Sequence, residues 1–221
     1  MALVKPRKHE STKARSHETT KPRKAFVACV SCFRVFVFSW LIVMTAQAFS
    51  QGTQARVESL EGGEVNPFDA PTDIKAIVFL FTSTDCPISN RYAPEVLRLA
   101  TKFAPKGVLF RLVYPDPADK RSAILDHMTA FAYAGATPAL RDPNHALVKF
   151  TGVTVTPEAA VYAGGRIVYH GRIDDRYVDL GLERPAATVH DLDEALIAVL
   201  AGRPVKHPVT QAVGCYIADF K

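Results

Sequence analysis

Residues 76–90 have the sequence AIVFLFTSTDCPISN. The first six residues predict a buried strand, the next four a tight loop, and the amphipathic segment after Cys86 a helix. This order places Cys86 at the first turn of that helix. The thiolate is the reactive form of cysteine, and the unpaired N–H groups and positive dipole end of a helix N-terminus stabilise it. Cys86 is therefore the candidate nucleophile.

Asp85 stands directly before this cysteine. Its side chain could cap the helix, but its negative charge would raise the pKa of the Cys86 thiol and oppose the helix dipole. The helix N-terminus and the Asp85 charge therefore have opposite effects on the pKa of the Cys86 thiol.

The first 48 of the 221 residues have the composition of a targeting segment. Residues 1–24 are basic, residues 25–48 are nearly all apolar, and Ala46-Gln47-Ala48 has the small-x-small form of a signal-peptidase site. Cleavage after Ala48 is the simplest interpretation. The alternative is an uncleaved membrane anchor, because the apolar segment approaches the ~20 residues of a spanning helix, although Arg34 interrupts it. Both alternatives place the rest of the chain outside the cytoplasm, in the periplasm or an equivalent compartment.

Charge supports this division. Residues 1–48 hold nine of the 27 Lys and Arg residues but only two of the 22 Asp and Glu residues, so the remainder carries a net charge of −2. No basic patch with interleaved aromatic residues remains after residue 48, and this argues against nucleic acid as a partner.

The four cysteines divide in the same way. Cys29 and Cys32 lie inside the apolar segment and are interpreted as small apolar residues rather than a redox pair. Cys86 and Cys215 remain, in a compartment where disulfides persist.

The rest of the chain is predicted to form a flexible lead-in at 49–73, one domain at 74–203, and a C-terminal tail at 204–221 that carries Cys215. In the domain, Gly164-Gly165 indicates a β-hairpin. We expect strands at 75–81, 107–114, 138–141, 158–163 and 166–170, and helices at about 87–104, 118–134, 143–151 and 188–201.

This alternation predicts an α/β protein with a mixed central sheet flanked by helices. The order of elements corresponds to a thioredoxin fold with an inserted helical unit. Two motifs carry the resemblance: the cysteine turn, with Pro94 eight residues after Cys86, and the segment Val153-Thr154-Val155-Thr156-Pro157 before the hairpin. The chain thus resembles the redoxin branch of the thioredoxin superfamily, which includes the alkyl-hydroperoxide-reductase and thiol-specific-antioxidant proteins.

The resemblance implies roles for individual residues. It implies a cis peptide bond between Thr156 and Pro157, with the proline facing the sulfur of Cys86 and the adjacent backbone pairing with substrate. We therefore expect Pro87, Thr156 and Pro157 to bind substrate.

One departure from the resemblance concerns the second thiol. A dithiol thioredoxin has Cys-x-x-Cys, whereas Ser89 occupies the second position here. A mixed disulfide at Cys86 cannot be resolved from that position, so Cys215 becomes the candidate resolving thiol. The alternatives are that Cys215 forms a structural disulfide with Cys86, or stays buried and inert.

Peroxiredoxins offer a second functional interpretation, since their nucleophilic cysteine also precedes a proline. Their P-x-x-x-T-x-x-C pattern would need Pro at Phe79 and Thr at Ser83, and their arginine would stand at Thr156-Pro157. Three other arginines are candidates to orient a peroxide in its place: Arg141, Arg166 and Arg172.

Metal and cofactor sites are not predicted. The histidines are scattered without the spacing of a zinc or haem site. Copper-delivering relatives have a second cysteine where this chain has Asn90, which disfavours a copper role. Asp174-Asp175 is interpreted as a polar turn rather than a catalytic pair.

Two classes of function remain. The first is a thiol-disulfide oxidoreductase or antioxidant redoxin in cell redox homeostasis, acting on protein thiols, protein disulfides or small thiols, with peroxide as a further candidate. The second is a binding module of thioredoxin fold, free or tethered to the membrane, in which Cys86 is sequestered.

Overall fold

The computed structural model describes residues 55–218. The predictions for the basic region 1–24 and the apolar segment 25–48, including Cys29, Cys32 and cleavage after Ala48, lie outside these residues. Among residues 55–218, no helix is both long and apolar enough to cross a membrane.

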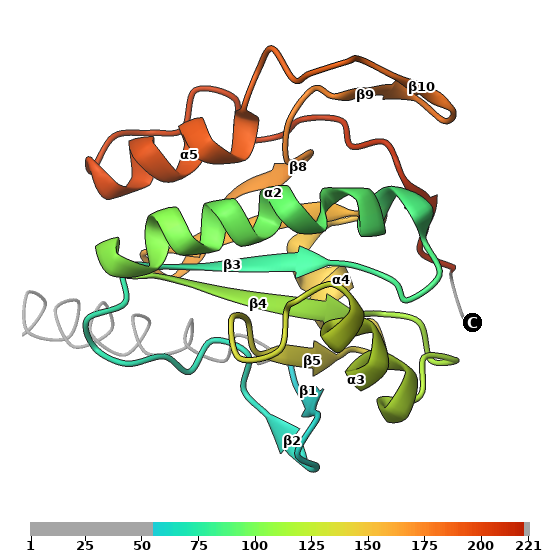
Figure 1. The fold of residues 1–221 in the computed structure, drawn as a ribbon. Coiled ribbons are helices and arrows are strands. Elements are labelled where there is room, and N and C mark those ends of the chain that lie inside the picture. The colour runs from blue at the N-terminus through green and yellow to red at the C-terminus, as the bar shows by residue number, and fades with distance from the viewer. Residues whose placement is uncertain (1–54, 219–221) are drawn as a thin grey trace, which may run out of the picture. The chain divides into compact units, whose positions relative to one another are not determined.

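A seven-stranded sheet forms the centre of the fold, in the order β2-β1-β5-β4-β3-β7-β8 (Figure 1). The pairs β3/β4 and β4/β5 are parallel and the other pairs are antiparallel, which confirms the predicted mixed sheet. Its strands are β1 (Val57–Ser59), β2 (Glu64–Val65), β3 (Ala76–Phe81), β4 (Val108–Tyr114), β5 (Ala139–Arg141), β7 (Glu158–Ala163) and β8 (Arg166–Gly171).

Strand β3 runs through the middle of the sheet because all six of its residues are apolar and buried. A strand buried on both faces has a continuous apolar run instead of an alternating one. Its last residue, Phe81, pairs with Val113 of β4 on one side and with Glu158 of β7 on the other. The loop that carries Cys86 therefore leaves the sheet next to the start of β7.

Helices cover both faces of the sheet. Helices α2 (Pro87–Phe103) and α5 (Asp191–Leu200) pack on one face, where Leu99, Phe103 and Leu196 belong to the larger core. Helix α4 (Ala146–Thr151) contributes Leu147 to the second core, on the other face. Burial of each such large apolar side chain stabilises the fold by about 1.5–3 kcal/mol.

Helix α2 follows the predicted bounds closely. It begins at Pro87, contains Pro94, and continues into the short 3-10 helix η1 (Ala104–Lys106). Proline suits the first helical position because the N–H that it lacks would have no intrahelical partner there.

The other three predicted helices are shorter in the structure, and α5 begins at Asp191 instead of 188. Helix α3 spans Arg121–Ala130 instead of 118–134, and the chain then turns through Ala132, which has a positive φ of 58°. Helix α4 begins at Ala146 instead of 143, because the Asp142 carboxylate accepts the N–H groups of its first three residues.

Within the segment 49–73 that the sequence analysis predicted as a lead-in, β1 and β2 extend the sheet beyond β5. Two small sheets were also not predicted. One pairs β9 (Tyr177–Asp179) with β10 (Leu182–Glu183), and the other pairs β6 (Val155–Thr156) with β11 (Cys215–Tyr216) in the tail.

Candidate active site

Cys86 is the N-cap residue of α2. Its backbone is extended, its carbonyl accepts the N–H of Asn90 at 3.0 Å, and its side chain is only 1 % exposed. Its position at the helix N-terminus agrees with the prediction.

Asp85 does not form the N-cap. Its carboxylate accepts a hydrogen bond from the Ser83 hydroxyl at 2.6 Å, and the neighbouring Thr84 hydroxyl donates to Asp119. These contacts order the loop between β3 and α2, and Pro87 lies exposed at the first position of the helix.

The bond between Thr156 and Pro157 is cis. Cys86 Sγ lies 3.1 Å from the Thr156 carbonyl oxygen and can donate a hydrogen bond to it. The sequence therefore located both halves of this contact, which are 70 residues apart along the chain.

Glu158 supports the loop from the other side and was missed by the sequence analysis. Its buried carboxylate accepts the N–H groups of Thr154 at 2.9 Å and Val155 at 3.3 Å, and its other oxygen lies 3.3 Å from His170 Nδ1. A charged residue opening the otherwise apolar strand Glu158–Ala163 was the available signal. Buried carboxylates need such partners.

Cys215 reaches the site through the tail. Strand β11 pairs antiparallel with β6, Cys215 lies opposite Thr156, and the Ile217 N–H donates to the Thr154 carbonyl at 3.0 Å. The two sulfurs of Cys86 and Cys215 are 2.7 Å apart, both as free thiols.

Gly214 makes this approach possible and was also missed. A Cβ atom on Gly214 would lie 2.2 Å from the Thr156 carbonyl oxygen, which is closer than real Cβ contacts come. Only glycine lets two backbones approach at this distance. Further back, the tail is held by hydrogen bonds between its residues Pro208 and Thr210 and the backbone of His170.

The two thiols have shifted pKa values of opposite sign. Burial opposes ionisation of Cys86, but interactions with Cys215 and with Ser89 on the first helical turn outweigh it and lower the pKa of the Cys86 thiol. Burial, the hydrogen bond to Cys86 and the charges of Cys86 and Asp85 raise the pKa of the Cys215 thiol to about 12. Cys86 is therefore the thiol of the pair that ionises first, and its thiolate could then accept a hydrogen bond from the neutral Cys215.

A cavity of about 220 Å³ opens beside the pair. Its wall includes Cys215, Thr156, Ser83, Asp85, Asp116 and His145, whereas Cys86 does not line it.

His127 fixes the start of α2 from the side of α3. Its ring lies between the Tyr114 hydroxyl at 2.9 Å and the Asn90 amide oxygen at 2.8 Å, and burial lowers its pKa. Asn90, which stands where copper-delivering relatives have a second cysteine, thus connects α2 to α3 through His127.

The arginines considered for peroxide binding are held elsewhere. Arg141 is paired with Glu58, and Arg172 is paired with Asp191 at 2.6 Å. Arg166 lies exposed at the start of β8, in the hairpin that joins it to β7.

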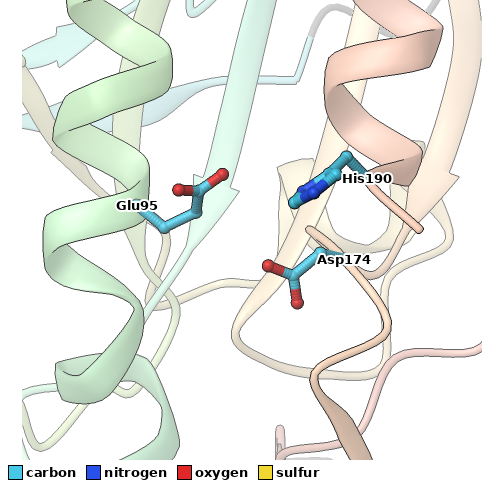
Figure 2. A group of neighbouring side chains, drawn as sticks. All are labelled: Glu95, Asp174 and His190. Carbon is cyan, nitrogen blue, oxygen red and sulfur yellow. The ribbon is translucent and has the colours of Figure 1, made fainter. Parts of the chain in front are cut away.

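One group of potential metal ligands comes together among residues 55–218: Glu95 of α2, Asp174 after β8, and His190 before α5 (Figure 2). One ligand atom from each lies within 4.8 Å of the others. Glu95, however, accepts two hydrogen bonds from Arg98, and Asp174 accepts the Tyr92 hydroxyl at 2.6 Å. The chain itself supplies partners for both carboxylates, so the group does not require a cation.

Asp175 is a buried residue after β8, where the sequence predicted a polar turn. Its carboxylate accepts the N–H groups of Thr188 and Val189 and the Thr188 hydroxyl, and these bonds tie the segment before α5 to the end of β8.

Comparisons with known proteins agree with the fold. Known protein families and curated proteins contain no match to this chain. Among solved structures, an uncharacterised conserved protein from Geobacillus kaustophilus is 26 % identical with a TM-score of 0.61, over 79 % of this chain and 94 % of that one. A hypothetical protein from Sinorhizobium meliloti is 25 % identical with a TM-score of 0.60, over 77 % of this chain and 95 % of that one.

A secreted disulfide oxidoreductase from Mycobacterium tuberculosis, homologous to E. coli DsbE, is also similar. It is 18 % identical with a TM-score of 0.45, over 67 % of this chain and 96 % of that one, values too low to bear on function. The chain has a thioredoxin-like fold, as predicted. Its assignment to the branch of alkyl-hydroperoxide reductases stays a prediction.

Proposed function

We propose that the protein is a thiol-disulfide oxidoreductase in which Cys86 is the nucleophile and Cys215 the resolving thiol. The observation that carries the proposal is the 2.7 Å contact between the two sulfurs, at the N-terminus of α2 and beside the cis proline loop. A thiolate favoured over its neighbour is the reactive partner in thiol-disulfide exchange.

The reaction begins when the Cys86 thiolate attacks a substrate disulfide. One substrate sulfur becomes bonded to Cys86 and the other leaves as a thiolate. The negative charge on Cys86 is then gone, and with it two of the causes that raise the pKa of Cys215. Cys215 loses its proton to the departing thiolate, attacks Cys86 Sγ, and releases the second substrate thiolate. The products are a Cys86–Cys215 disulfide, one substrate thiol and one substrate thiolate, and the thiolate takes its proton from water.

Thr156 and Pro157 have a positioning role in this proposal. The Thr156 carbonyl accepts a hydrogen bond from the protonated Cys86 thiol at 3.1 Å, and β11, paired with β6, places Cys215 opposite Thr156. Pro87 lies exposed beside the reacting sulfur and is the proposed contact for substrate. Substrates of the proposed class are protein disulfides or small disulfides.

The test is a redox titration of the full-length chain in glutathione buffers, with peptide mass mapping of all four cysteines. We expect a Cys86–Cys215 bridge that opens and closes within the range of the buffers. A bridge that never opens, or two thiols that never react, would contradict the proposal and favour a binding module.

Thiol peroxidase is the second candidate. The burial of Cys86 favours it, because a hydroperoxide is small enough to reach a sulfur that is 1 % exposed. A peroxide must be oriented as well as attacked. Arg141 and Arg172 are already paired with Glu58 and Asp191, and this argues against peroxidase activity. Consumption of hydrogen peroxide by the reduced chain, faster than by its Cys86→Ser variant, would establish this activity.

Export is a further part of the proposal. It rests on the basic residues 1–24 and the apolar residues 25–48, and it agrees with a mechanism in which a disulfide forms and persists. A fusion of residues 1–54 to a reporter that is active only outside the cytoplasm tests it, and the size of the product separates a cleaved signal from a retained anchor.

A further inference from the structure

Access to the two sulfurs is unequal. Cys86 is 1 % exposed, whereas Cys215 is only partly buried. In a thiol-disulfide exchange, the attacked sulfur must be reached by the incoming thiolate, and the other sulfur leaves. The difference in exposure therefore affects which of the two sulfurs in a Cys86–Cys215 disulfide an external thiolate can attack.

The cavity beside the pair gives a second, independent indication. It has room for a small thiol or for one side chain of a partner, and it is lined by Cys215 and not by Cys86. A sulfur that enters this cavity meets Cys215 first.

The tail also closes the usual approach to Cys86. The edge of β6 next to the cis proline is paired with β11, and Gly214 lies against the Thr156 carbonyl. An extended polypeptide could use that edge only after β11 has left it, because each backbone group of the edge pairs with one strand.

We propose that Cys215 is the sulfur through which thiols enter the oxidised protein, by way of the cavity beside Asp85 and Asp116. This rests on the proposed function, because it requires the Cys86–Cys215 disulfide. The incoming thiolate bonds to Cys215 Sγ, the Cys86–Cys215 bond breaks, and Cys86 leaves as a thiolate. A second thiolate then attacks the external sulfur of the mixed disulfide on Cys215, an external disulfide forms, and Cys215 leaves as a thiolate that takes a proton from water.

The environment of Cys86 suits a leaving group. A thiol of lower pKa leaves faster, and interactions with Ser89 on the first turn of α2 help to lower the pKa of Cys86. Roles are thus divided along the chain: Cys86 attacks in the reduced protein, and Cys215 is attacked in the oxidised one.

The cavity predicts which thiols enter fastest. The carboxylates of Asp85 and Asp116 line it, and Asp85 is one cause of the raised pKa of Cys215. Negative charge near the attacked sulfur repels an anionic thiol and attracts a cationic one. We expect cysteamine to open the bridge several-fold faster than 2-mercaptoethanesulfonate, after normalisation to their rates with a small free disulfide.

The experiment uses the full-length chain after oxidation. Peptide mapping first establishes the Cys86–Cys215 bridge, and its absence would refute the proposed function itself. The oxidised protein is then mixed with cysteamine, quenched with acid within milliseconds, alkylated and mapped. We expect cysteamine on Cys215 and the alkyl group on Cys86. The reverse distribution, with the bridge present, would overturn this inference and leave the proposed function standing.

Charge variants provide a readout that does not depend on trapping the adduct. Asp85→Asn should reduce the preference for cysteamine over 2-mercaptoethanesulfonate by at least about twofold. Asp126→Asn, on an exposed position of α3, is the matched control and should leave the preference unchanged. Equal preferences in all three proteins would show that thiols do not enter through this cavity.

Discussion

Gly214 and Thr156 are in backbone contact so close that a Cβ atom on the glycine would lie 2.2 Å from the threonine carbonyl oxygen. This contact joins the tail to the cis proline loop and brings the next residue, Cys215, to the sulfur of Cys86. The pairing of the two thiols thus depends on one residue that carries no reactive group.

Gly214→Ala should therefore separate the two thiols. The new methyl group cannot fit against Thr156, so β11 should leave β6, and alkylation of Cys86 by iodoacetamide should become at least about tenfold faster. Formation of the Cys86–Cys215 bridge should slow by a similar factor. Gln211→Ala, at an exposed position of the same tail, is the control. Unchanged alkylation in Gly214→Ala would mean that the tail does not protect Cys86.

Cys215→Ala should raise the pKa of the Cys86 thiol, because it removes a hydrogen bond that favours the thiolate. In the unaltered protein, the pH profile of Cys86 alkylation should have its midpoint below the ordinary thiol value of about 8.5. The midpoint should move upward in Cys215→Ala. A midpoint that stays in place would remove Cys215 from the causes of the shift.

The same two shifts predict how stability depends on pH. The lowered pKa of Cys86 contributes stability above the pKa of the unfolded thiol, and that contribution disappears as pH falls through the folded value. The raised pKa of Cys215 contributes stability below the unfolded pKa, and it is lost as pH rises toward about 12. Urea unfolding of Cys215→Ala should accordingly show a smaller loss of stability above pH 9 than the unaltered protein.

Glu158→Gln should destabilise the loop before the hairpin. The glutamine lacks the charge that strengthens the hydrogen bonds from Thr154 and Val155, which both go to one carboxylate oxygen. We expect a loss of about 1–3 kcal/mol in the free energy of unfolding, measured with urea. Glu64→Gln, at an exposed position of β2, should change the stability by less than about 0.5 kcal/mol. Equal effects of the two changes would contradict this role for Glu158.

Tyr92→Phe tests the group drawn in Figure 2. The substitution removes the hydroxyl that donates to the buried Asp174 carboxylate, and it should cost about 1–3 kcal/mol of stability. Tyr216→Phe is the control, since Tyr216 is 83 % exposed. Thermal unfolding with and without Zn²⁺ also tests whether Glu95, Asp174 and His190 bind a metal. We expect the midpoint temperature of each variant to be the same with and without Zn²⁺.

The sequence by itself determined the central part of the fold. The run from Ala76 to Phe81 predicted the buried strand, the amphipathic segment after Cys86 predicted α2, and Gly164-Gly165 predicted the hairpin. These signals are local, because a strand, a helix and a tight turn each depend on residues that are close in the chain. The contact of Cys86 with the cis proline loop followed from two motifs and a resemblance, and the structure confirms it.

Only the tertiary structure decided which sulfur is covered and which is open. Cys86 and Cys215 are separated by 129 positions, and β11 has two residues, too few for any periodic pattern. Its place depends on unpaired backbone groups at the edge of β6 and on the space left by Gly214. Burial of Glu158, the pairing of β1 with β5 and the β9/β10 hairpin are decided in the same way. Each depends on what the rest of the chain packs against it, and no short stretch of sequence contains that information.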